Sequence, residues 1–269
     1  MRYVGTSAEM SPMSNAMLMK VLLCFVKDTQ NINSDTLKKK TKTSITTTIK
    51  IAIIMILGME IIKMEQLVKN IIATRRKATL DDIQNGVEWY ATAQRNCLDI
   101  AESFSVPLNI VVGVVSALSP NNKWSRNIAN ANDLIGAFIN GDAIESVKVS
   151  TYNAMKKKAW SILEDMPTDN DKIIKMLNGQ KIISFYKCIM DLDACCIDGH
   201  ARNIAYNERI GLTDDRTNIG IREYRTLVDA YIQASKRCSI VDNGKRRKLK
   251  PYELQAITWT VWRKQWGIS

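Results

Sequence analysis

Two side chains in the second half of the sequence have the types and the spacing for chemistry on a sugar. Lys181 follows a short turn, Asn178-Gly179-Gln180, and Asp198 follows an apolar stretch that ends in Cys195-Cys196-Ile197. A lysine amine is a nucleophile that forms Schiff bases, and a fixed carboxylate stabilises positive charge that develops on a sugar ring. The pattern predicts one buried helix between them, and we expect the amine and the carboxylate to meet at one site.

Each residue also has a structural interpretation. Asp198 can be the N-cap of a helix that begins at Gly199, and this role is compatible with catalysis. Lys181 can be a solvated lysine or a phosphate contact, in which case Asp198 would activate water. Gly179 is expected to supply the positive φ of a tight turn, and Gln180 to open a helix N-terminus on which a phosphate can rest.

The sequence after Met64 has the pattern of helices throughout. Apolar residues recur at helical spacing over residues 79–104, behind a threonine cap and two acids. The apolar run 107–118 is long enough to favour a core helix over a strand. Further helices are predicted at residues 122–141, 150–166, 169–177, 181–191, 198–210, 221–237 and 251–266, with Ser150 as the cap of the second of these. No strand is predicted, and residues 242–251 are expected to be a basic loop. The predicted fold class is all-α.

In this helical context the sequence resembles the helix–hairpin–helix DNA glycosylases, the endonuclease-III-like base-excision enzymes. That family has a hairpin such as LPGVGRKTA and, one helix later, VDTH; this chain has LNGQKIIS at residues 177–184 and IDGH at residues 197–200. Lys181 and Asp198 fall on the family's Schiff-base lysine and catalytic aspartate. Three further segments resemble segments of that family and occur in the same order along the chain. They are SALSPN at 116–121, TYNAMKKKAWSIL at 151–163 and HARNIAYNERIGL at 200–212. The resemblance covers about residues 107–267.

The resemblance implies a glycosylase-like helical bundle that cleaves the N-glycosidic bond of a modified or damaged base in DNA. It also implies strand cleavage where Lys181 forms a Schiff base. The target base must leave the duplex to react. Asn121 and Asn122 are the candidates to fill the space it leaves, and Trp124, Tyr186 and His200 are the candidates for its pocket. The residues expected to contact the DNA are Gly179, Gln180, Asn121, Asn122, Lys123, Arg202, Lys245, Arg246 and Arg247.

The sequence departs from the family in two places. The turn has one glycine and no proline, and the C-terminal iron–sulfur loop of four cysteines is absent. The chain also resembles an uncharacterised group of phage-encoded proteins. Two alternatives therefore stay open: a base-modification enzyme of the same fold that acts on an altered pyrimidine, and a non-catalytic DNA-binding module. His200 also has an alternative, as a hydrogen-bonded structural histidine.

Composition narrows the class of partner. The 38 Lys and Arg residues exceed the 27 Asp and Glu residues, for a net charge of +11, which favours an anionic partner, and we expect DNA. The six cysteines form no CxxC pair and no metal-ligand cluster with the single histidine, so we expect no bound metal and no cofactor. We also expect no disulfide framework, which favours a cytoplasmic location. The apolar run 51–58 is too short to span a membrane, and a monomer is expected.

Residues 1–63 differ from the remainder. They are rich in Thr, Lys, Ile and Met, and their apolar runs lack a clean period. We expect them to be a poorly structured extension, with the helical glycosylase-like domain at residues 64–269. Met59 and Met64 offer later starts, and a start at Met64 would leave the extension out of the native protein.

Overall fold

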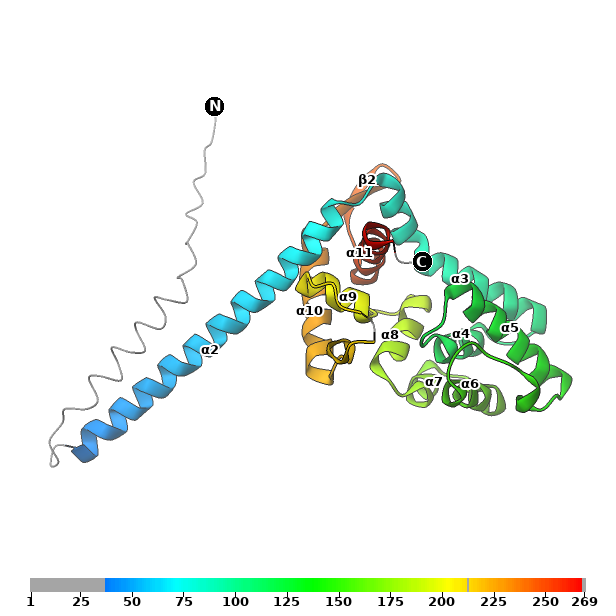
Figure 1. Cartoon of the computed structure of the whole chain (residues 1–269), viewed down its shortest axis with the longest axis horizontal. Coiled ribbons are helices and arrows are strands. Elements are labelled where there is room, and N and C mark those ends of the chain that lie inside the picture. Colours follow the sequence, from blue (N-terminus) through cyan, green and yellow to red (C-terminus); the bar gives the residue numbers. More distant parts are fainter. Residues whose placement is uncertain (1–36, 212, 268–269) are drawn as a thin grey trace. The chain divides into compact units, whose positions relative to one another are not determined.

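The computed structural model describes residues 37–211 and 213–267, with side chains from Lys50 onward (Figure 1). Residues 1–36, which include Cys24, lie outside the described part. The described part is mostly helical, which confirms the predicted class in its coarse form. The helices are α2 (Leu37–Arg76), α3 (Leu80–Phe104), α4 (Leu108–Leu118), α5 (Trp124–Asn140), α6 (Asn153–Asp165), α7 (Asn170–Leu177), α8 (Gln180–Ile189), α9 (Gly199–Tyr206), α10 (Ile221–Arg237) and α11 (Pro251–Trp266). Two single-turn 3-10 helices, η1 (Ile144–Ser146) and η2 (Asp215–Thr217), lie in connecting segments.

The chain divides into two compact units, and the division falls inside the residues of α2, between Glu60 and Ile61. Residues 37–60 are helical. The prediction of a poorly structured extension was therefore wrong for this described part of it. The segment has no amphipathic period, but it contains no proline, and so nothing in its backbone chemistry prevents a helix.

Local signals at the helix ends explain why the predicted boundaries agree well with the structure. Thr79 caps α3 by accepting a hydrogen bond from the backbone N–H of Asp82 (3.2 Å), while the Asp82 carboxylate accepts one from the N–H of Thr79 (2.9 Å). Gly141 ends α5 in the left-handed conformation, with φ 79°. The predicted cap Ser150 was wrong. Its N–H donates to Asn130 Oδ1 (2.8 Å), and α6 begins only at Asn153.

The stretch 242–251 is not a loop throughout, because most of it belongs to an antiparallel β-hairpin. Strand β1 (Ser239–Asp242) pairs with β2 (Lys245–Lys248), with Val241 opposite Arg246. Asn243 and Gly244 have φ values of 49° and 75°, the pair of positive angles that a type I′ turn requires. The prediction of no strand was therefore wrong, although Asn-Gly is a strong short-range hairpin signal.

The unit from Ile61 onward has two apolar core clusters. The first is built mainly from α3 to α8 and the second mainly from the C-terminal part of α2 with α9, α10 and α11. Helix α11 contributes to both, because Ala256 belongs to the first cluster and Ile257 to the second. The two clusters therefore meet along α11 and the helix α3 that packs on it.

The five cysteines in the described part of the chain are free and buried. Cys188, Cys195 and Cys196 are among them, which confirms the prediction that they are core thiols. Between residues 37 and 267, no single described helix has the length and apolar character to cross a membrane. Only α3 and α4 taken together meet that test, and they are bent by 119° at the break between them.

The packing of α3 on α11 makes a first prediction. A Cβ atom at Gly86 would lie 2.5 Å from Ile257 Cγ1 and 2.6 Å from both Cα and N of the same residue. Because backbone cannot move aside as a flexible side chain can, Gly86→Ala should lower the free energy of unfolding by about 1–3 kcal/mol. Urea denaturation measures this. Gly58→Ala, where the new methyl meets no atom within 4 Å, is the control. Equal stability of both variants would contradict the close approach.

Candidate functional site

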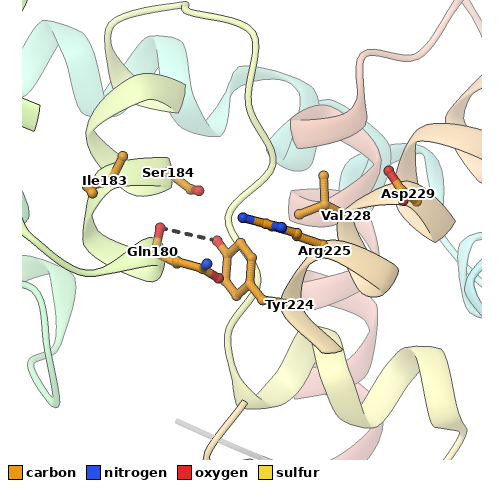
Figure 2. Close-up of a pocket in the computed structure, with 7 residues that line it drawn as sticks. All are labelled: Gln180, Ile183, Ser184, Tyr224, Arg225, Val228 and Asp229. Carbon is orange, nitrogen blue, oxygen red and sulfur yellow. Dashed lines mark hydrogen bonds between the residues drawn. The ribbon is translucent and has the colours of Figure 1, made fainter. Parts of the chain in front are cut away.

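The two chain segments that carry Lys181 and Asp198 are joined through the hydroxyl group of Tyr224 on α10. This hydroxyl accepts a hydrogen bond from the N–H of Ile197 (3.1 Å), the residue before Asp198. It also lies 3.4 Å from the carbonyl oxygen of Gln180, to which it can donate (Figure 2). The carbonyl oxygen of Cys195 lies at the same distance. The start of α8 and the segment that leads into α9 are therefore side by side.

A second contact links the same two segments. The thiol of Cys196 donates to the carbonyl oxygen of Lys181, with a sulfur–oxygen distance of 3.6 Å. Lys181 lies in the first turn of α8, where its side chain is exposed. The structure thus brings the backbone at Lys181 next to the side chain of Cys196, two residues before Asp198.

The turn before Lys181 contains two residues of positive φ. Gly179 has φ 159°, as predicted, and is the N-cap position of α8, and Asn178 before it is left-handed, with φ 42° and ψ 81°. Lys158 of α6 donates to the carbonyl oxygens of Leu177 and Asn178 (3.3 Å to the latter). The ammonium group therefore neutralises the carbonyl end of α7 and fixes the turn from outside.

Asp198 has the structural role that its sequence also allowed. It is the N-cap of α9, and its Oδ1 accepts a hydrogen bond from the N–H of Ala201 (2.8 Å). The side chain is half-buried. Within residues 37–211 and 213–267, Oδ2 has no hydrogen-bond partner. One oxygen thus fixes the orientation of the carboxylate.

His200 lies within the electrostatic reach of both residues. It is 8% exposed, and its Nδ1 has no hydrogen-bond partner among the described atoms. Burial lowers the pKa of the imidazole, the charges of Arg263 and Lys181 lower it further, and Asp198 opposes them. The ring is therefore neutral at pH 7. Its unpartnered nitrogen differs from the alternative expectation of a fully hydrogen-bonded structural histidine.

Four half-buried aromatic side chains, from four different helices, form a cluster that extends to His200. The Trp89 ring centroid lies 5.4 Å from that of Trp124, 5.9 Å from that of Phe185 and 6.5 Å from that of Trp259. The Trp259 ring in turn lies edge-to-face with His200 at 6.5 Å, and the guanidinium of Arg263 lies 4.3 Å from its centroid. We call Trp89, Trp124, Phe185 and Trp259 the aromatic cluster. Only Trp124 among them was singled out from the sequence.

Tyr186, predicted to line the same pocket, lies elsewhere. Its side chain is fully buried in the first core cluster, and its hydroxyl donates to Asn170 Oδ1 at 2.6 Å. A ring in this position cannot stack on a base that enters from solvent. Phe185, one residue earlier and turned to another face of α8, is the aromatic residue that joins the cluster.

Two of the residues that were predicted to contact DNA form ion pairs within the protein. Arg202 is 8% exposed, pairs with Glu223 and Glu208 at 3.2 Å each, and stacks on Tyr206. Arg247 pairs with Asp242 at 2.7 Å and makes a two-pronged contact with Glu253 at 2.8 Å. These guanidinium groups stabilise the fold, so the prediction that they contact phosphate is corrected.

The remaining predicted contacts lie on the surface or hold a loop. Asn121 and Lys123 are exposed, and Asn121 adopts a positive φ of 55°. Asn122 is half-buried and donates to the carbonyl oxygen of Leu118 (3.2 Å), so it fixes the turn between α4 and α5. Lys245 and Arg246 are exposed on the β-hairpin.

A cavity of about 280 Å³ lies between α8 and α10, beside the Tyr224 contact (Figure 2). Neither Lys181 nor Asp198 lines it. Its walls are Gln180, Ile183, Ser184, Tyr224, Arg225, Val228 and Asp229. The cavity therefore adjoins the Tyr224 contact and is not lined by either candidate residue. No group of three His, Cys, Asp or Glu side chains suited to a metal ion occurs in the part of the chain that the structure describes.

Removing the Tyr224 hydroxyl should loosen this arrangement. Tyr224→Phe leaves the buried N–H of Ile197 without its acceptor, and we expect the free energy of unfolding to fall by about 1–3 kcal/mol. Chemical denaturation monitored by tryptophan fluorescence measures the change. Tyr152→Phe removes the hydroxyl of an exposed tyrosine and should have almost no effect. If the two variants are equally stable, the bridge does not form.

His200 makes the stability depend on pH in a defined direction. In the unfolded chain its pKa is 6.5, and in the folded protein it is lower, so the unfolded state takes up the proton first. The stabilisation is complete above pH 6.5 and is lost as the pH falls below that value. We expect the urea midpoint to fall more steeply between about pH 7.5 and about pH 5.5 in the wild type than in His200→Gln. Parallel curves would refute the assignment.

Comparison with known proteins identifies a family but not an activity. The model of a family of unknown function (DUF7178) matches residues 55–266, which is most of the chain and nearly all of the unit from Ile61 onward. No curated protein and no solved structure matches the chain. The chain belongs to the family of unknown function DUF7178.

Proposed function

We propose that the protein cleaves the N-glycosidic bond of a modified or damaged base in DNA, with Lys181 and Asp198 as its catalytic residues. The observation that supports this most directly is the Tyr224 hydroxyl. It contacts the backbone immediately before each of the two residues, Gln180 on one side and Ile197 on the other. The backbone segments that carry the lysine and the carboxylate thus share one contact, which supports a common site for the two side chains.

The chemistry assigns a separate task to each side chain. As the bond from the sugar C1′ to the base breaks, the bonding electrons leave with the base and positive charge grows on the sugar. The free Oδ2 of Asp198 stabilises that charge, and Oδ1 stays fixed by the N–H of Ala201. The lone pair of the Lys181 amine then bonds to C1′, and the nitrogen gives up a proton that the departing base takes. When the C1′–O4′ bond breaks, O4′ takes a proton from water and the nitrogen and C1′ form a Schiff base, from which the strand can be cleaved.

The aromatic cluster is suited to hold the base during this reaction. Its four rings are half-buried, so part of each remains open to contact. Stacking of a base on an aromatic side chain contributes about 1–3 kcal/mol.

Borohydride trapping tests the reaction. We expect wild-type protein to form a covalent adduct with duplexes that carry an abasic site or one of a panel of damaged bases, and Lys181→Ala to form none. Asp198→Asn should lower the rate of base release about 10²–10³-fold, because it removes the charge. Asparagine caps a helix as well as aspartate does, so the melting temperature of this variant should stay close to that of the wild type.

Lys175→Ala is the matched control, since Lys175 is an exposed lysine on the neighbouring helix α7. It should trap like the wild type. Base release without trapping, lost only in Asp198→Asn, would reduce the role of Lys181 to binding. DNA binding that survives both substitutions, with no product from any base tested, would overturn the enzymatic proposal in favour of a binding module.

A further inference from the structure

The β-hairpin separates its basic residues onto two faces. Side chains alternate across a strand, so Arg246 and Lys248 share one face of β2 and Lys245 and Arg247 share the other. The face with Arg247 is turned inward. Its partner in the register, Ile240, packs against the second core cluster, and Arg247 itself is paired with Asp242 and with Glu253 of α11.

The opposite face is turned to solvent. Val241, which pairs with Arg246 across the hairpin, is 75% exposed, and both Arg246 and Lys248 are exposed. Within the described ranges, neither of these two side chains takes part in an ion pair. Alternate residues of a strand are about 6.6–6.8 Å apart, so two like charges stand next to each other on this face.

The C-terminal end of α2 adds positive charge to the same place, and Figure 1 shows β2 beside it. Arg75 Nη2 donates to the carbonyl oxygen of Ser239 at 3.4 Å. Burial raises the pKa of the Cys238 thiol, and the positive charges of Arg75, Lys248 and Arg76 each oppose that rise. Arg75, Arg76 and Lys248, from two elements, are therefore all within electrostatic reach of one buried sulfur.

Some other basic side chains on this unit are instead paired with acids. Arg237 is paired with Glu65, Lys172 with Asp165 and Lys250 with Asp191. At the spacing of alternate strand residues, two exposed like charges repel by about 0.6 kcal/mol in water. A row of anions placed along the face relieves that repulsion and releases counterions, which is the physical basis of phosphate-backbone binding.

We propose that Arg246, Lys248 and Arg76 form a docking surface for the phosphodiester backbone of duplex DNA, which the protein grips at this surface without reading its sequence. We call these three residues the wing surface. The proposal is separate from the reaction at Lys181 and Asp198, because it concerns the binding of intact DNA that carries no target base.

The test uses the full chain and an undamaged fluorescent duplex. Fluorescence anisotropy gives the dissociation constant at a series of salt concentrations. For Arg246→Glu/Lys248→Glu we expect about a tenfold weaker affinity at low salt, with a slope of log K against log salt that is smaller by about 2. The loss should be equal for duplexes of unrelated sequence, since phosphate contacts carry no sequence information.

Lys157→Glu/Lys175→Glu provides the same change in net charge at two exposed positions on α6 and α7. It should keep the wild-type salt slope. Arg246→Gln/Lys248→Gln removes the two positive charges without adding carboxylates, so it controls for repulsion by the new acids. It should also reduce the slope of log K against log salt. Equal binding by the wing and control variants would overturn the proposal. Loss of binding to anionic lipid vesicles with unchanged DNA binding would also overturn it.

Discussion

One buried hydroxyl group determines where the candidate chemistry is placed. The Tyr224 hydroxyl joins the start of α8 to the segment before α9, and so the positions of the amine and the carboxylate depend on a third helix that carries neither. Helix α9 has only eight residues and would not be stable alone. Its neighbour α10 holds it at two further points, through the ion pair between Glu223 and Arg202 and through the Tyr231 hydroxyl, 3.4 Å from the Ala201 carbonyl. The N–H of Ala201 orients the Asp198 carboxylate, and the contacts with α10 fix the position of the helix that carries this N–H.

The basic side chains fall into two groups. Some form ion pairs inside the fold, and others lie on its surface. Arg202 and Arg247 look in the sequence like any other basic residues, yet each is held by two carboxylates. If such an arginine moved to a phosphate, it would leave two partly buried carboxylates without a compensating positive charge, which is unfavourable. A net charge of +11 therefore favours an anionic partner but does not locate its binding surface. The ion pairs in the structure show which cations are already engaged and which surface an anionic partner could contact.

Most of the helical fold was predictable because helix ends are decided locally. Thr79, Gly141 and Pro251 each act on the backbone within a turn of their own position, and the predicted ends near them agree with the structure. The β-hairpin was missed because basic residues dominated the interpretation of a stretch whose Asn243-Gly244 pair was itself a turn signal. The candidate pair Lys181 and Asp198 was found from spacing and resemblance. The Tyr224 hydroxyl was not, because its bonds reach 27 to 44 residues along the chain and leave no local pattern.

The aromatic cluster could not be recognised from the sequence for a related reason. Trp89, Phe185 and Trp259 fall at helical spacing on three helices, which in a sequence is indistinguishable from ordinary core. Three of the four rings, Trp89, Trp124 and Phe185, pack against the first core cluster and stay half-buried there. The chain segments of the candidate pair belong to different core clusters. Ile182, the residue after Lys181, belongs to the first core cluster, and Ile197, the residue before Asp198, belongs to the second. The separation of amine and carboxylate is thus set by how the two clusters pack together, and the Tyr224 hydroxyl is the polar contact that crosses between them.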